Sequence, residues 1–316
     1  MLTELEIPVT TQDGTRLSLW RVRDDASNPP VGTSDVFLTH GTFSDKRICL
    51  GMAKHLANLG YCCWILEWRG HGSSGASATA FNFDTVAQCD VMATLDHLEH
   101  RQGIRRLHCV THSGGGLVLT MCLTRHPHLA PLVDRAVLFA CQALHAAPSM
   151  SRKWLLRSLR LAGRLHGSIP GRRLGLGIQD ESCFMMQQWY DWNISERFIG
   201  LDGFDYLANL RQLKLPVLSV SGAADRLIAP PAACRKYLEA CGGDGNRSIE
   251  CGVSSGFRLD YAHANVLHSR AAMSEIWPIA VDWLACATTP SDRSVLDTRG
   301  DPEPHGKKFV EPKNGI

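Results

Sequence analysis

The sequence lacks the features that mark several classes of protein. Its net charge is only +2, with 33 basic and 31 acidic residues among 316, so no overall charge favours nucleic acid as a partner. It contains no run of 18 apolar residues, which a membrane-spanning helix needs. Its first residues, MLTELEIPVTTQDG, have neither the charged nor the apolar segment of a signal peptide. We therefore expect no nucleic-acid partner, no transmembrane segment and no secretion leader.

Neither the cysteines nor the glycines are spaced for a familiar metal or nucleotide site. The twelve cysteines include no C-x-x-C pair and no Cys/His spacing typical of zinc. Four of them lie inside apolar runs, where a free cysteine behaves as a small hydrophobic residue: Cys63, Cys109, Cys122 and Cys141. No phosphate-binding loop of the P-loop or dinucleotide type occurs. We expect no metal, no cofactor and a reducing, cytoplasmic location.

Apolar runs of strand length alternate with segments of helical pattern along most of the chain. Two β-rich runs flank Asp13-Gly14, which is typical of a hairpin. Further strands are expected at residues 35–40, 61–68, 106–112, 135–142, 215–222 and 247–253. Helices are expected at residues 45–60, 84–103 (with Asp84 as N-cap), 115–127, 230–243 and 265–286. Because the strands are apolar throughout and separated by helices, the sequence predicts an α/β fold with a mainly parallel central sheet and helices on both faces.

About seventy residues interrupt this alternation between two strands of the core. A loop of that length without structure of its own is uncommon, and residues 143–213 are too aromatic to be disordered. They contain Trp154, Phe184, Trp189, Tyr190 and Trp192. We predict a core formed by residues 1–142 and 214–287, an inserted helical cap at residues 143–213, and a flexible C-terminal tail at residues 288–316, which has no periodicity.

The predicted cap has a one-sided charge pattern. Residues 151–179 contain seven cationic residues and no acidic one, and Lys153, Arg157, Arg160 and Arg164 recur at helical spacing. The ordinary interpretation is a helix that packs its apolar side on the core and keeps its charges in water. The alternative is a surface that attracts acidic substrates or lipid headgroups, with peripheral membrane contact through the basic cap. Such a cap over an apolar cleft would suit acyl chains.

Ser113 stands where a strand should pass into a helix, followed by three glycines in the stretch THSGGG. Small neighbours permit a sharp, strained turn that holds a serine hydroxyl above the sheet, and the helix N-terminus favours developing negative charge. This is the logic of the G-x-S-x-G nucleophile elbow. Thr111 departs from it, because a β-branched residue at the first position crowds the turn. The alternative is a glycine-rich helix start that only packs, with Ser113 as N-cap.

A nucleophilic serine needs a base, and the base needs an acid that orients it. In an open parallel sheet, reactive groups gather at the carboxyl ends of the strands. Asp225 and His263 each follow a predicted strand, and the order Ser113, Asp225, His263 is the one used with this elbow. Other acids and histidines that could compete are Asp205, Asp260, His112 and His268. His112 directly precedes the serine and therefore points elsewhere.

The chemistry also requires backbone N–H donors for the oxyanion that forms on the substrate. The N–H of Gly114, directly after the serine, is one candidate. The stretch LTHGTFSDK follows a predicted strand, and the N–H of Thr42, or of Phe43 one residue later, would point to the same site. His40 is expected to brace this loop.

The motifs HGTF, EWRGHGSSG, THSGGG, SGAADRLIAP and DYAHANVL, with WPIAVDWL after them, occur in this order over residues 5–287. Together they resemble the serine hydrolases of the α/β-hydrolase superfamily, in particular its esterase- and lipase-like members. The resemblance implies Ser113 as nucleophile, His263 as base and Asp225 as orienting acid. It also implies that WRGHGSSG is a structural turn, with Arg69 and His71 near the mouth of the site.

The expected function is therefore a serine hydrolase that cleaves a carboxylic ester through an acyl-enzyme intermediate, acting on an apolar or acyl-chain small molecule. The resemblance also implies that serine at the elbow excludes epoxide hydrolases and dehalogenases, which need aspartate there. An acyl thioesterase or an acyltransferase would use the same three residues. A non-catalytic binding protein of this fold is the remaining alternative, favoured by Thr111 and by Ala262 before the histidine, and disfavoured by the complete, ordered triad.

Overall fold

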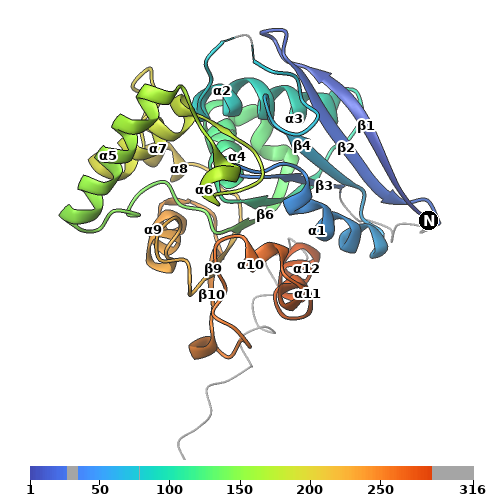
Figure 1. Cartoon of the computed structure of the whole chain (residues 1–316). Helices are drawn as coiled ribbons and strands as arrows, with labels where there is room; N and C mark the ends of the chain where they lie inside the picture. The colour runs from blue at the N-terminus through green and yellow to red at the C-terminus, as the bar shows by residue number, and fades with distance from the viewer. Residues whose placement is uncertain (27–34, 78, 287–316) are drawn as a thin grey trace, which may run out of the picture. The chain divides into compact units, whose positions relative to one another are not determined.

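Eight strands form one sheet in the computed structural model, which describes residues 1–26, 35–77 and 79–286 (Figure 1). In sheet order they are β1 (Leu2–Thr10), β2 (Arg16–Asp24), β4 (Cys63–Glu67), β3 (Asp35–Thr39), β5 (Leu107–His112), β6 (Val133–Phe139), β9 (Val217–Gly222) and β10 (Arg247–Cys251). β1 and β2 form the predicted hairpin, and β2 is also antiparallel to β4. The pairings from β4 to β10 are all parallel, so the predicted sheet is confirmed.

Helices cover both faces of the sheet, because neighbouring strand residues are apolar on opposite sides. Phe37 and Cys109 pack with the side chains of α4 (Gly114–Arg125) and of the continuous run α2 (Phe83–Thr85), η1 (Val86–Val91) and α3 (Met92–His100). Val36 and Val110 point the other way, toward α1 (Arg47–Asn58) and the C-terminal helices. Both clusters are closed to water, so the sheet is buried as parallel sheets require. α9 (Pro231–Ala240) contributes to both of them.

Two predicted helix limits are wrong for local reasons. The N-cap of the helix at residues 84–103 is Asn82, whose side chain accepts the Thr85 N–H at 3.0 Å, and Asp84 lies inside the first turn. The helix expected at residues 265–286 is three helices, α10 (Asn265–His268), α11 (Arg270–Glu275) and α12 (Trp277–Ala285). Ser269 is extended and caps α11 with its hydroxyl, and Pro278 has no N–H to continue a helix across the second junction.

The segment between β6 and β9 contains helices at the positions of the predicted cap. Its elements are α5 (Met150–His166), β7 (Ser168–Ile169), α6 (Gly171–Leu174), β8 (Glu181–Ser182), α7 (Cys183–Ser195) and α8 (Tyr206–Leu210). α5 and α7 lie side by side, whereas α8 packs on α4 (Figure 1). The limits of core and cap stay a prediction, and the predicted tail at residues 288–316 lies outside the described residues. Within the described part of the chain, no helix has the length and apolar character needed to cross a bilayer.

Asp84, buried at the start of α2, joins the core to this inserted segment. Its carboxylate accepts from the Gln188 side chain of α7 at 2.5 Å, from the Leu201 N–H at 3.0 Å and from the Tyr206 hydroxyl of α8. Gln188 also accepts the Phe83 N–H at 2.9 Å. Because buried polar groups are costly to leave unpaired, these bonds fix α7 over α2.

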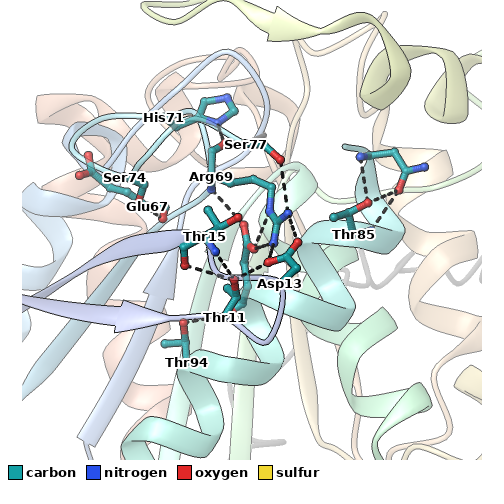
Figure 2. A network of polar contacts seen from close by, with 12 residues as sticks. Thr11, Asp13, Thr15, Glu67, Arg69, His71, Ser74, Ser77, Thr85 and Thr94 are labelled. Atoms are coloured by element: carbon teal, nitrogen blue, oxygen red, sulfur yellow. Dashed lines mark hydrogen bonds and ion pairs between the residues drawn. The ribbon is translucent and has the colours of Figure 1, made fainter. Parts of the chain in front are cut away.

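Arg69 joins the β1–β2 hairpin to the turn that follows β4. Its side chain is fully buried, with Nε 2.8 Å from Asp90 in η1 and Nη1 2.6 Å from Asp13 in the hairpin turn. Figure 2 shows the guanidinium beside Asp13, whose carboxylate also meets the Thr11 hydroxyl. The Arg69 guanidinium holds the pKa of Asp13 well below its usual range. Burial is the largest influence on Asp90 and raises its pKa, against the opposing effect of Arg69.

We predict that Arg69→Met lowers the free energy of unfolding by about 3–5 kcal/mol, because it leaves the buried Asp90 carboxylate without its cation. Urea denaturation followed by circular dichroism measures the change. Arg235→Met is the control, since Arg235 pairs with Glu250 on the exposed surface and such pairs contribute about 0–1 kcal/mol. Equal losses in the two variants would contradict a structural role for the buried pair.

Candidate active site

Ser113 lies at the turn between the end of β5 and the start of α4. Its φ is +54° and its ψ is −123°, a backbone region that costs a non-glycine residue on the order of 1–3 kcal/mol. The Ser113 N–H donates to the Phe139 carbonyl of β6 at 2.7 Å. The serine is therefore held as a single strained residue at the carboxyl edge of the sheet.

The glycines that follow Ser113 are required by close packing. A Cβ at Gly115 would lie 2.6 Å from the His40 carbonyl oxygen, and one at Gly116 would lie 2.6 Å from Cys141 Sγ. Helix α4 can start here only because these two positions have no side chain. Thr111 is the fully buried fifth residue of β5, and its Oγ1 would lie 3.2 Å from a Cβ at Gly116. That Thr111 crowds the turn stays a prediction.

The structure places Ser113, His263 and Asp225 in one chain of hydrogen bonds. Ser113 Oγ lies 2.9 Å from His263 Nε2, and His263 Nδ1 lies 2.5 Å from Asp225 Oδ2. Asp225 follows β9, and its carboxylate also accepts the N–H groups of Ile228 and Ala229, each at 3.1 Å. An ionised carboxylate can only accept, so Nδ1 carries the proton and Nε2 is free to accept the serine proton.

Burial and hydrogen bonding act in opposite directions on the Asp225 carboxyl. Burial, the largest influence, would raise its pKa, but the bond with His263 and the two backbone N–H groups outweigh it and lower the pKa below its usual value. The carboxylate is thus ionised at neutral pH, as the orientation of the His263 ring requires.

The competing histidines and acids have other partners. His112 Nε2 lies 3.0 Å from the His263 carbonyl oxygen and donates to it, and burial lowers the pKa of His112 to about 3. It therefore supports the backbone of His263. Asp205 caps α8 through the Ala208 N–H, and Asp260 accepts the Val253 N–H. His268 ends α10 with an exposed side chain.

The loop after β3 lies directly against the serine. A Cβ at Gly41 would be 2.7 Å from Ser113 Cβ and 3.0 Å from the Gly114 nitrogen. Thr42 and Gly114 line the cavity described below, and among the described residues neither of their N–H groups has a hydrogen-bond acceptor. The Phe43 N–H is already engaged, because it donates to Glu181 Oε2 at 3.2 Å. Of the two alternatives from sequence, the geometry favours Thr42 over Phe43.

His40 braces this loop, as expected. Its side chain is fully buried, its Nε2 accepts the Trp68 N–H at 3.2 Å and its Nδ1 lies 2.8 Å from the Gly41 carbonyl oxygen. Arg69 and His71, expected near the mouth of the site, are both buried, and neither lines the cavity in the described part of the chain. His71 contacts Glu181, a residue that belongs to no recognisable sequence motif.

A cavity of about 630 Å³ lies between Ser113 and the cap. Its walls from the core include Phe83, Leu117, Leu227 and Ile228, and its walls from the cap include Leu155, Leu156, Leu159, Leu174, Leu176, Met186 and Trp189. Arg152 is the one permanently charged side chain among the described residues that line it. Its guanidinium donates to the carbonyl oxygens of Ala146, at 3.3 Å, and of Arg226, directly after Asp225. The space beside the serine is therefore mostly apolar.

No group of three or more histidine, cysteine or acidic side chains is placed to hold a metal ion in residues 1–26, 35–77 and 79–286. All twelve cysteines are free thiols.

A family model described as serine aminopeptidase, S33, matches residues 33–184. A gastric triacylglycerol lipase of Mus musculus is 27% identical over 147 residues, which cover 41% of this chain and 37% of the lipase. Lipase member K of Homo sapiens is 29% identical over 142 residues, which cover 40% of this chain and 36% of the lipase. The match thus spans little more than a third of these curated relatives.

Solved structures match over far more of the chain at lower identity. An esterase from Exiguobacterium antarcticum has a TM-score of 0.62 at 16% identity, over 89% of this chain and all of that chain. A monoacylglycerol lipase from Paleococcus ferrophilus has a TM-score of 0.59 at 17% identity, over 85% of this chain and 98% of that chain. At such identities the likeness establishes the fold.

We predict that Asp225→Asn lowers kcat for an ester substrate by about 10⁴-fold, because an amide in place of the carboxylate favours the wrong histidine tautomer. Steady-state hydrolysis of p-nitrophenyl butyrate measures the effect. Asp260→Asn is the control, since the Asp260 carboxylate accepts the Val253 N–H, away from the bonds that join Ser113, His263 and Asp225. A kcat for Asp225→Asn within tenfold of the wild type would contradict the role assigned to Asp225.

Proposed function

We propose that this esterase- and lipase-like member of the α/β-hydrolase superfamily hydrolyses carboxylic esters through an acyl-enzyme on Ser113. The observation that carries the proposal is the continuous chain of hydrogen bonds from Ser113 through His263 to Asp225 beneath an apolar cavity. Each residue has the partner that its role requires. His263 can accept the Ser113 proton and can donate to Asp225, and Asp225 is kept ionised.

The reaction begins when His263 Nε2 takes the Ser113 proton and Oγ attacks the carbonyl carbon of the ester. The carbonyl π electrons move to the oxygen, which becomes an oxyanion in reach of the Thr42 and Gly114 N–H groups. The protonated His263 then gives its proton to the departing alkoxide, and the alcohol leaves. Asp225 stabilises the imidazolium while it exists.

Water completes the cycle by the reverse sequence. His263 removes a proton from water, the hydroxide oxygen bonds to the acyl carbon, and Ser113 leaves with the proton returned by the histidine. The N-terminus of α4 adds to the stabilisation of each oxyanion, because the dipole of a helix is positive at that end and no side chain caps it here.

The apolar walls of the cavity favour an acyl chain or another apolar group. Its volume lies within the usual range of sites for small molecules, roughly 300–1,000 Å³, and few polar atoms face it. The names of several relatives, triacylglycerol and monoacylglycerol lipases, point to the same class of substrate. We also propose that the exposed, basic outer side of α5 makes peripheral contact with a lipid surface. A cytoplasmic location is part of the same proposal.

We predict that Ser113→Ala abolishes both ester hydrolysis and covalent labelling by a fluorophosphonate, while the melting temperature changes little. The reason is that only the nucleophilic oxygen is removed. Labelling of the intact chain is read by mass spectrometry.

Failure of the folded wild-type chain to label would favour a non-catalytic binding protein. Faster turnover of acyl thioesters than of matched esters would favour the thioesterase alternative, and acyl transfer to an added alcohol would favour the transferase.

We predict that kcat/KM rises from acetate to medium-chain p-nitrophenyl esters, because each buried methylene adds favourable transfer free energy. Leu159→Trp should reduce the ratio of decanoate to acetate hydrolysis about tenfold or more, since Leu159 lines the cavity. Leu161→Trp is the matched control, because Leu161 lies on the same helix and is 62% exposed. A wild-type chain that cleaves only acetate would contradict the acyl-chain preference.

A further inference from the structure

Glu181 of β8 is a buried acid in the cap that the reaction above does not use. Its Oε2 lies 3.2 Å from the Phe43 nitrogen and 3.2 Å from His71 Nε2, and its Oε1 accepts the Ser182 N–H at 2.8 Å. Glu181 and His71 are each 1% exposed. A buried carboxylate is costly unless it is paired and hydrogen-bonded, and here three donors from three segments converge on it.

The hydrogen bonds of His71 define the charge of this pair. Its Nδ1 lies 3.0 Å from the Arg69 carbonyl oxygen, which can only accept. Its Nε2 faces a carboxylate oxygen, so both ring nitrogens need a proton and the ring is an imidazolium. Burial, the largest influence, would lower the pKa of His71, but the Glu181 carboxylate outweighs it and the pKa is raised. The neighbouring Asp90 acts in the same direction, and the His40 ring lies 5.2 Å away.

The cap holds Phe43 from both sides of its peptide backbone. The Ile178 and Gln179 N–H groups donate to the Phe43 carbonyl at 2.8 and 3.0 Å, and Glu181 accepts the Phe43 N–H. Phe43 has φ +60°, a conformation that costs a bulky residue free energy and persists only where its surroundings impose it. Three hydrogen bonds from residues 178–181 impose it here.

The geometry points to Glu181 as a positioning residue: held by His71, it fixes Phe43 so that the adjacent Thr42 N–H faces the oxyanion formed at Ser113. This rests on the proposed function, because it concerns the same ester hydrolysis. Glu181 bonds neither Ser113 nor His263, so its effect on the reaction passes through the loop. The Thr42 donor is then in place only while residues 178–181 of the cap are seated on the loop.

The proposal predicts that Glu181→Ala lowers kcat for p-nitrophenyl butyrate about tenfold or more and leaves KM within about twofold. Removal of one oxyanion donor lowers kcat by about 10²–10³-fold. Here the Thr42 N–H would still be present but no longer held in place, so the expected loss of kcat is smaller. Glu181→Gln keeps an oxygen that can accept the Phe43 N–H, and should recover most of the lost kcat. Asp191→Ala is the matched control, because Asp191 is an acidic cap residue paired with Arg160 on the surface.

A folded Glu181→Ala chain with wild-type kcat would overturn the proposal, as would a loss shared equally by Asp191→Ala. Failure of the proposed function gives a different result: the wild-type chain would neither label with fluorophosphonate nor turn over esters.

If Glu181→Ala does not fold, peptide-level hydrogen exchange of the wild type answers the question. A methylphosphonate on Ser113, whose oxygen would occupy the position of the oxyanion beside the Thr42 N–H, should slow exchange in residues 177–182. Unchanged exchange there would overturn the proposal.

Discussion

The left-handed backbone at Ser113 is the constraint on which the site depends. A turn this sharp is kept only because both of its sides are fixed: the Ser113 N–H donates to β6, and α4 is packed against the end of β3 at Gly115. The same packing brings Gly41 against the serine and so places the Thr42 N–H beside it. At the end of β5, His112 supports the backbone of His263. The proposed nucleophile, oxyanion donors and base are therefore positioned by one set of close contacts at the carboxyl ends of β3, β5 and β6.

The cap combines an apolar inner wall with buried polar attachments. Leucines of α5 and α6 line the cavity, and apolar contacts of this kind have no preferred direction. The attachments are directional: Asp84 fixes α7 over α2, and Glu181 reaches the loop after β3. Because a buried polar group that loses its partner is costly, each of these hydrogen bonds favours one position of the cap on the core. The placement of the cap and the apolar surface of the cavity thus depend on different side chains of the same segment.

Local sequence patterns predicted much of this arrangement. Apolar runs identified the parallel strands, and the serine among glycines, the acid and the histidine after strands identified the three residues that the structure brings together. The features that could not be predicted depend on contacts between residues distant in sequence. Glu181 lies 138 residues from Phe43 and 110 from His71 and belongs to no motif. The buried ion pairs of Arg69 were not foreseen because its partners, Asp13 and Asp90, come from elsewhere in the chain. The choice between Thr42 and Phe43 required knowing which N–H was already bonded.

Arg152 gives the cap a second polar connection to the core, separate from that of Glu181. It reaches from the first turn of α5 to the carbonyl of Arg226, in the loop that presents the carboxylate to the imidazole. Two separate parts of the inserted segment therefore contact two loops of the core, the one after β3 and the one that carries Asp225. A chimaera that exchanged this insertion for a relative's would change the walls of the cavity and, through Arg152, the support of the loop that carries Asp225, so under the proposed function substrate choice and rate would change together.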